Sequence, residues 1–231
     1  MPNDAQAQSQ RQAQFRYGVV FLIVLVLLVF EIAASDAHWA RAIDIALAGA
    51  ALSVTVATSR ERGEVRRRRA LIVGVVALAV VIMVASGLLS TAVTFLVFTF
   101  LLAAVPVGLV GGLSRLIRTR GVNGQVVAGA LAIYLLVGLL FASLIAFVGA
   151  VESGSYFKQV ASVPNGVRVY YSFTVLTTTG FGDYTAATPV GHALAVLEML
   201  TGQLYLVTVI GVVVGNFAGR RTQADPQARP S

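Results

Sequence analysis

The chain has 231 residues, of which 57% are hydrophobic and only 12% are Asp, Glu, Lys or Arg, and its mean hydropathy is +0.83. So little charge cannot cover the surface of a soluble globule of this length, and the composition therefore predicts a protein of the lipid bilayer. The chain has no cysteine and two histidines, which excludes disulfides and thiolate metal sites and leaves no zinc-binding set. The formal net charge of +7 does not indicate a nucleic-acid partner, because the arginines lie in short segments between apolar runs, as membrane topology requires. No constellation of catalytic residues is visible in the sequence, and we expect neither enzymatic activity nor a cofactor.

Six apolar runs predict an all-α membrane protein with six transmembrane helices. A bilayer core of about 30 Å needs roughly 20 helical residues, and the candidate runs are residues 17–34, 42–59, 70–87, 89–110, 123–151 and 189–219. Thr188 and Pro189 are typical of an N-cap and a first-turn proline, and predict where the last helix begins. The first run has an alternative interpretation as a signal peptide, since a basic segment precedes it and small residues follow it. Its length favours a span.

The distribution of basic residues predicts the orientation. With the N-terminus inside, fourteen of the 17 Lys and Arg residues fall on the cytoplasmic side, and the other three are Arg41, Lys158 and Arg168. The positive-inside rule then places both tails, residues 1–16 and 220–231, in the cytoplasm of a multi-pass protein of the plasma membrane. A cluster of arginines between the second and third spans either binds anionic lipid head groups or acts only as a topology determinant; its members are Arg66, Arg67, Arg68 and Arg69.

A short polar loop lies between the fifth and sixth runs, and residues 177–183 read Thr-Thr-Thr-Gly-Phe-Gly-Asp. Two glycines around one aromatic residue permit backbone dihedrals that other residues avoid, so successive carbonyl oxygens can face one axis and replace the hydration shell of an ion. Each chain contributes only one such loop, and a ring of carbonyl oxygens needs several loops around one axis. This predicts a homo-oligomer with four subunits. The turn residues 164–166 predict a short helix that ends near Leu176 and is re-entrant, because it is too short to span. The C-terminal end of this helix would point inward and favour a cation below the loop.

Residues 170–183, Tyr-Tyr-Ser-Phe-Thr-Val-Leu-Thr-Thr-Thr-Gly-Phe-Gly-Asp, resemble with their two flanking spans the pore domain of the tetrameric potassium channel superfamily. The resemblance implies a selectivity filter made of Thr178, Thr179, Gly180, Phe181 and Gly182, with potassium ions bound at the first four. It also implies that the Thr178 hydroxyl forms the innermost ring, while Thr177, Asp183, Tyr170 and Tyr171 support the filter. Valine in place of Thr179 and tyrosine in place of Phe181 are more common in the family, and the strictness of potassium selectivity therefore remains open.

Two residues of the last helix are further candidates. Glu198 is an ionisable group in an apolar run, where such groups are costly and usually functional. It either supports the filter through a hydrogen bond to its back or to the re-entrant helix, or forms a pore-lining ring of four carboxylates. Gly202 matches the position of the gating hinge of the family, and the alternative is a glycine that only makes room for a neighbouring helix.

The six-span layout is that of voltage-gated channels, but the expected gating charges are missing. No Asp, Glu, Lys or Arg occurs between Leu71 and Ser114, whereas voltage sensing requires charges that move through the membrane field. Residues 17–114 are therefore predicted to form a voltage-sensor-like domain without gating charges, joined by a cytoplasmic linker at 115–122 to the pore domain at 123–219.

The sequence predicts a homotetrameric potassium-selective channel that conducts passively and has weak or no voltage dependence. The alternatives are a non-selective monovalent cation channel, a potassium transporter subunit and a non-conducting scaffold with a relic filter. A transporter of that class carries four re-entrant loops in one chain, whereas this chain has one, and the intact glycines argue against a relic.

Overall fold

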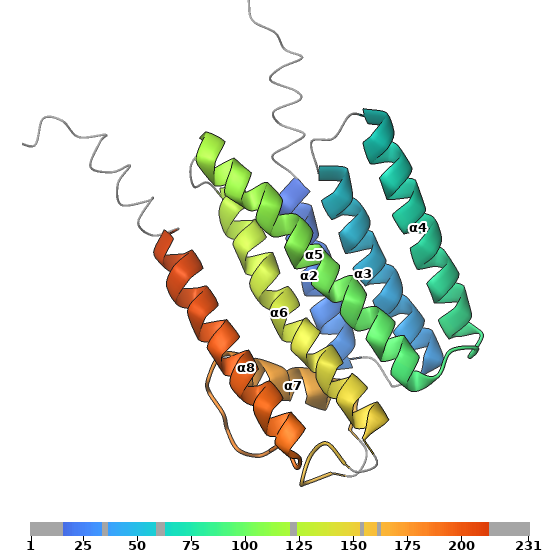
Figure 1. Cartoon of the computed structure of the whole chain (residues 1–231), viewed down its shortest axis with the longest axis vertical. Coiled ribbons are helices and arrows are strands. Elements are labelled where there is room, and N and C mark those ends of the chain that lie inside the picture. The colour runs from blue at the N-terminus through green and yellow to red at the C-terminus, as the bar shows by residue number, and fades with distance from the viewer. Residues whose placement is uncertain are drawn as a thin grey trace, which may run out of the picture.

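The computed structural model describes residues 16–33, 37–58, 63–120, 124–152, 155–160 and 163–212. The described part is a helical bundle (Figure 1), and its only β-type pairing is an isolated bridge between Phe157 and Ala186. The elements are α2 (Arg16–Ala33), α3 (His38–Thr58), α4 (Gly63–Ala85), α5 (Thr91–Arg120), α6 (Gly124–Val151), α7 (Asn165–Leu176), α8 (Pro189–Tyr205) and a π-helical segment η1 (Leu206–Ile210) that continues α8.

Three of these helices are long and apolar enough to cross a bilayer. The candidate spans are Thr91–Gly111, Gly124–Val151 and Pro189–Val209, with mean hydropathies of 2.5, 2.7 and 1.3, and two shorter apolar helices are Tyr17–Ala33 and Gly74–Ala85. The predicted all-α class and the membrane character are therefore confirmed. The count of six spans stays a prediction.

The first helices and the predicted pore segment share one hydrophobic core. Helix α6 packs against α5 and α2, whereas α4 lies at the edge of the bundle against α3 (Figure 1). The buried members of this core include Leu27, Ile45, Leu102, Leu136 and Val169, one each from α2, α3, α5, α6 and α7. Burial of these side chains fixes the position of α7 relative to the bundle.

Two helix boundaries differ from the predicted ones. Helix α4 begins at Gly63, so the arginines 66–69 belong to its first turns and not to a loop. Helix α5 continues to Arg120, so the described part of the predicted linker, residues 115–120, is helical. The predictions followed the apolar runs, whereas arginine, leucine and isoleucine also continue a helix beyond the apolar part. The predicted end of the last helix at Gly219 lies outside the described residues.

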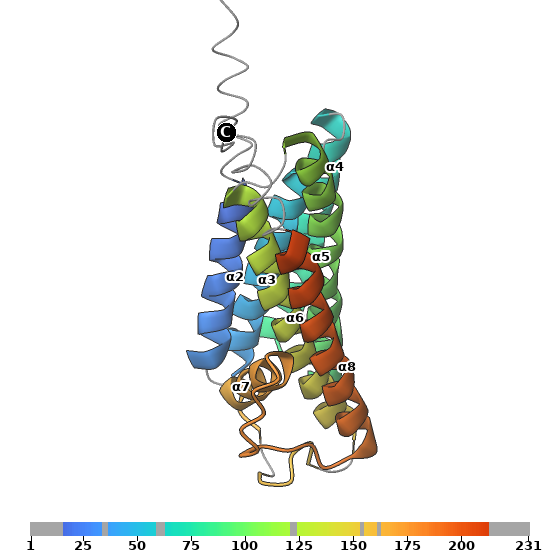
Figure 2. The same ribbon diagram turned by 90° about the vertical axis from the view of Figure 1, so that its left-hand side faces the viewer.

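Helix α7 lies across one end of the bundle, next to the loops that follow α6 and precede α8 (Figures 1 and 2). It contacts α6, α8 and α2. Two glycines permit this close packing: a Cβ on Gly138 would lie 2.6 Å from the ring of Phe173, and a Cβ on Gly166 would lie 2.8 Å from the carbonyl oxygen of Ile32. The loop residues Tyr156 and Phe157 are also buried here.

Candidate functional site

Helix α7 covers the twelve residues Asn165–Leu176 and leads directly into the glycine-containing loop. Pro164 stands at its N-cap position with φ −61° and ψ 153°, the extended conformation that proline permits before a helix. The helix ends at Leu176 as predicted, but it begins at Asn165 and not after the turn residues 164–166. Thr188 caps the next helix as predicted, because its Oγ1 accepts a hydrogen bond of 3.1 Å from the Gly191 N–H.

The loop N–H groups after α7 turn back towards the helix. The N–H of Thr178 donates to the Val175 carbonyl over 2.9 Å, and those of Thr179 and Gly180 donate to the Thr174 carbonyl over 2.9 and 3.1 Å. In a planar trans peptide the N–H and the C=O point in opposite directions. The carbonyl oxygens of Thr177, Thr178 and Thr179 therefore all point away from α7. This is the arrangement that a ring of carbonyl ligands needs from each of its strands.

The backbone conformations of the loop explain how this is possible. Thr178, Gly180 and Gly182 have positive φ angles of 56°, 52° and 81°, and Thr178 is the only described non-glycine residue with a positive φ. Glycine adopts such angles without strain, as the sequence predicted for Gly180 and Gly182. A β-branched residue in this region costs about 1–3 kcal/mol and persists only when its surroundings hold it.

The Thr178 hydroxyl has two partners that hold this conformation. Its Oγ1 donates to the Thr177 carbonyl over 2.7 Å and accepts a hydrogen bond of 2.9 Å from Nε2 of Gln203 on α8. Gln203 was not among the predicted site residues. The sequence offered no local signal for it, since the contact depends on how α8 packs beside the loop.

The aromatic and carboxylate residues predicted to support the loop divide into two groups. The Tyr170 ring stacks on Phe181 with a centroid distance of 6.2 Å and an interplanar angle of 4°, and its side chain is a hydrogen-bond partner of Asp183. The Thr177 and Thr179 hydroxyls contact each other at 2.9 Å.

Tyr171 belongs to a second group of contacts. It packs edge-on against Phe157, with a ring-centroid distance of 4.8 Å. Phe157 reaches Tyr184 at 5.7 Å, and Tyr171 itself is a hydrogen-bond partner of the Ala186 backbone just beyond the loop. Tyr156 and Phe157 were missed because nothing in their local sequence distinguishes them.

Glu198 is completely buried and faces α7. The Ser172 Oγ lies 2.5 Å from Glu198 Oε1 and 2.7 Å from the Gly138 carbonyl oxygen. The serine hydroxyl has one hydrogen, and a carbonyl cannot donate. With an ionised Glu198 the serine shares its hydrogen between the two acceptors, and with a neutral Glu198 the carboxyl group donates to Ser172, which then donates to Gly138 alone.

The second carboxyl oxygen, Oε2, has no hydrogen-bond partner among the described residues. A buried charge without partners is costly, which supports the neutral form. In the single subunit the side chain of Glu198 lies under α8 and not on its exposed face. Glu198 thus contacts the short helix α7, and the choice between filter support and a pore-lining ring stays a prediction.

Gly202 is the point where α8 touches the end of α7. A Cβ at this position would collide with the Leu176 carbonyl oxygen, so the glycine is required for close approach. The helix is α-helical at Gly202, and the π-helical segment begins at Leu206. Close packing, the alternative interpretation of Gly202, is thus what the structure displays, and the hinge stays a prediction.

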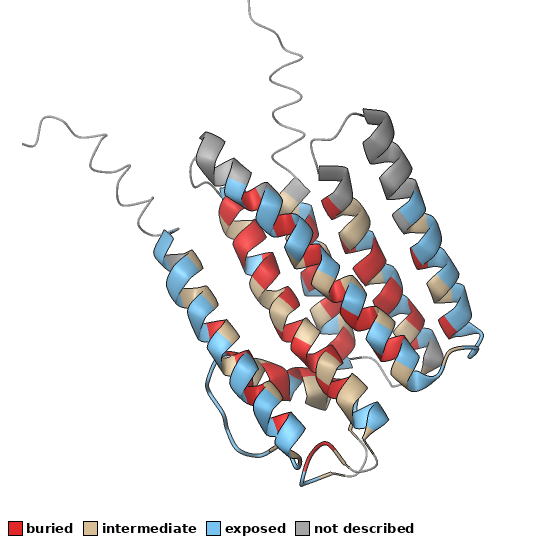
Figure 3. Ribbon diagram, in the orientation of Figure 1, coloured by how far each residue is buried: buried red, intermediate tan, exposed pale blue. Residues whose placement is uncertain are grey.

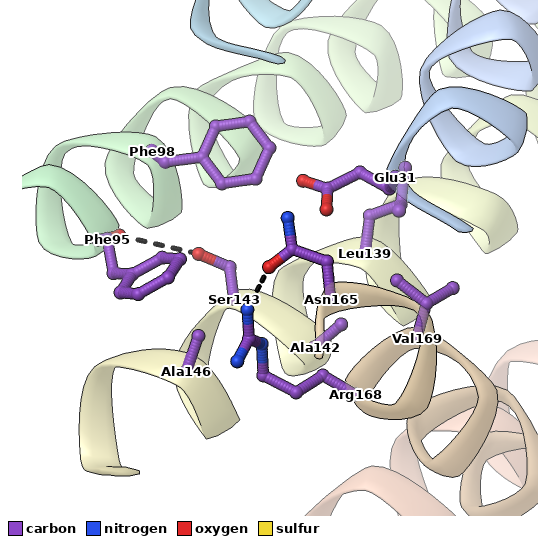
Figure 4. A pocket seen from close by; sticks show the side chains of 10 residues that line it. All are labelled: Glu31, Phe95, Phe98, Leu139, Ala142, Ser143, Ala146, Asn165, Arg168 and Val169. Atoms are coloured by element: carbon purple, nitrogen blue, oxygen red, sulfur yellow. Dashed lines mark hydrogen bonds between the residues drawn. The ribbon is translucent and has the colours of Figure 1, made fainter. Parts of the chain in front are cut away.

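A pocket with both apolar and polar lining residues lies between the start of α7 and helices α2, α5 and α6 (Figure 4). The Arg168 guanidinium lies 5.3 Å from the centroid of the Phe95 ring and donates to the Asn165 side chain. Arg41 approaches the same ring at 5.5 Å. Glu31 and Ser143 also line the pocket. These contacts involve the N-terminal end of α7. Among the described residues no group of His, Cys, Asp and Glu forms a metal site.

Comparisons with known proteins support an ion channel. Residues 129–218 match the model of a family described as ion channel. The chain is also similar to potassium voltage-gated channel subfamily A member 10 of Mus musculus and of Homo sapiens, with 32% identity over 90 residues in each case. These matches cover 38% of this chain but only 17% of each relative. No solved structure matches the chain.

Residues 129–218 are therefore similar to an ion-channel family. The relatives that this part of the comparison found are named as potassium channels. The resemblance drawn from residues 170–183 is confirmed.

Proposed function

We propose that the chain forms a homotetrameric potassium-selective channel that conducts passively through residues 178–182. The observation that carries this proposal is the common direction of the Thr177, Thr178 and Thr179 carbonyls, which follows from the hydrogen bonds of the three N–H groups to α7. Oxygens on one side of a strand replace the water ligands of a dehydrating ion when several strands surround it. Potassium ions bind at Thr178, Thr179, Gly180 and Phe181.

Four subunits complete the ring. Residues 177–183 are exposed along their whole length in the single subunit, and one strand surrounds no ion. Helix α8 beside them is also largely exposed (Figure 3), and its exposed apolar side chains include Val196, Leu197, Leu200, Leu204 and Val207. Such a face requires other subunits or lipid. The C-terminal end of α7 adds partial negative charge near the inner end of the filter and stabilises a cation there.

The contacts behind the filter favour selectivity over the alternative of a non-selective monovalent cation pore. The Tyr170–Phe181 stack and the Tyr170–Asp183 contact tie the outer half of the loop to α7. The Thr177–Thr179 contact braces the inner half. A restrained loop holds its oxygens at one distance and discriminates between ions of different size.

Voltage dependence is weak or absent in this proposal. The relatives are named voltage-gated, but the matched segment is only 17% of their length, and residues 72–113 of this chain carry no charge. Helix α5 does carry Arg115, Arg118 and Arg120 near its end, beyond the apolar span that ends at Gly111. Charges outside the apolar span cross little of the membrane field.

The distribution of Lys and Arg between the two sides of the membrane supports a plasma-membrane protein with both termini in the cytoplasm. The same topology brings the first turns of α4, which contain residues 66–69, to the inner surface. There they contact anionic lipid head groups.

The test is potassium flux into liposomes that contain the purified protein. The Gly180→Ala variant is the matched control, because Gly180 has a φ of 52° and a Cβ there strains the filter backbone without meeting another atom within 4 Å. We expect flux from the native chain and none from Gly180→Ala. Equal flux from both proteins would refute the assignment of the filter.

A further inference from the structure

The inner end of the loop has a contact with α8 that the proposed function does not use. Gln203 Nε2 donates to Thr178 Oγ1 over 2.9 Å, and both side chains are exposed in the subunit. Thr178 Oγ1 simultaneously donates its hydrogen to the Thr177 carbonyl. Gln203 therefore touches the hydroxyl that forms the innermost ring of the filter.

The backbone geometry fixes this contact. Gly202 lies against the Leu176 carbonyl at the end of α7 and admits no side chain there, so α8 comes close to the last residue before the loop. The next residue of α8 is Gln203. Its long side chain bridges from the helix to the Thr178 hydroxyl, whereas the neighbouring Thr201 hydroxyl bonds only within its own helix, to the Leu197 carbonyl over 2.7 Å.

The hydrogen bond from Gln203 reduces the number of lone pairs with which the Thr178 hydroxyl can coordinate an ion. A hydroxyl oxygen has two acceptor lone pairs and one hydrogen. The hydrogen is directed to Thr177, and Gln203 occupies one lone pair, which leaves one lone pair for a cation. An amide N–H placed against the oxygen also presents partial positive charge to any ion at this ring.

We propose that Gln203 is a specificity-determining residue that lowers the affinity of the innermost filter site for cations. In a tetramer the four Gln203 amides stand beside the four Thr178 hydroxyls and weaken ion binding where ions enter or leave the filter on the inner side. Conduction requires sites that release ions as well as bind them. This inference rests on the proposed channel function and adds the residue that tunes one of its sites.

The test measures block by internal Ba²⁺, a divalent cation close to potassium in size, in inside-out patches. The variants are Gln203→Leu, which removes the amide, and Gln203→Asn, which keeps an amide but shortens the side chain by one methylene and cannot reach Thr178. We expect the half-blocking concentration of Ba²⁺ to fall about fivefold in both variants, the effect of one ordinary hydrogen bond. Thr201→Val is the matched control and should change it less than twofold.

Block that is unchanged in both Gln203 variants would overturn the inference, and so would a change in Gln203→Leu alone, since that would reflect polarity near the pore and not the bond. Native current in the same patches tests the proposed function separately. A second readout needs no current: calorimetric titration of Ba²⁺ into the purified protein in detergent should show the same affinity gain in both variants. Equal Ba²⁺ affinities of the native and variant proteins there would refute the inference even if the native protein passed no current.

Discussion

Ser172 on α7 and Glu198 on α8 approach to 2.5 Å between Oγ and Oε1, and the same Ser172 oxygen lies 2.7 Å from the Gly138 carbonyl on α6. One serine side chain thus joins the three helices that surround the filter loop. A neutral carboxyl group on Glu198 donates to the serine and leaves the serine hydrogen for Gly138 alone.

The first prediction concerns Glu198. Glu198→Gln should keep potassium flux within about twofold of the native value, because the amide N–H₂ donates to Ser172 as the protonated carboxyl does. Glu198→Ala should lower the free energy of unfolding by about 1–3 kcal/mol, since the Ser172 oxygen loses its donor inside the protein. Flux and thermal unfolding of the two variants measure these effects. A sharp loss of cation current in Glu198→Gln would instead indicate a pore-lining carboxylate.

Gly202 gives a second prediction. Gly202→Ala should destabilise the protein by about 1–3 kcal/mol, because its Cβ would collide with the Leu176 carbonyl and force α8 away from α7. Gly211→Ala is the control, as a Cβ there meets nothing within 4 Å. Thermal unfolding compares the two. A Gly202→Ala protein of native stability but altered open probability would favour a hinge over a packing role.

The Tyr170 hydroxyl supports the third prediction. Tyr170→Phe keeps the ring that stacks on Phe181 and removes only the partner of Asp183. With the outer half of the loop less restrained, the permeability ratio of potassium to sodium should fall several-fold while potassium current persists. Bi-ionic reversal potentials measure this ratio. An unchanged ratio would show that the stack alone restrains the loop.

Voltage dependence provides the fourth prediction. Open probability should change by less than a factor of about three between −100 and +100 mV, because residues 72–113 have no charge to move. Patch recordings over this range give the result directly. Steep activation would point to the arginines at the end of α5 as sensor charges.

Local sequence predicted α7 and the special loop conformations well. Gly180 and Gly182 predicted positive φ angles, because glycine alone adopts such angles freely. Thr188 and Pro189 predicted the start of α8. A buried acid such as Glu198 was expected to have a partner, and the bond to the short helix was one of the two interpretations weighed.

Contacts between helices could not be predicted from the sequence. Thr178, which has a positive φ, bonds to Gln203, and Gly202 beside Gln203 lies against the Leu176 carbonyl. The identity of Ser172 as the partner of Glu198, and the burial of Phe157 beside Tyr171, likewise arise from packing between segments far apart in the chain. Helices α4 and α5 extend beyond the apolar runs that were predicted as spans, because hydropathy marks the membrane-spanning part and not the whole helix.

Reversal potential under opposed potassium and sodium gradients tests the central claim most directly. The native protein is reconstituted into planar bilayers with potassium on one side and sodium on the other, and the current is recorded as a function of voltage. A potassium-selective pore through residues 178–182 predicts reversal near the potassium equilibrium potential. Reversal near 0 mV at equal concentrations would contradict selectivity, and an absence of current would contradict the channel itself.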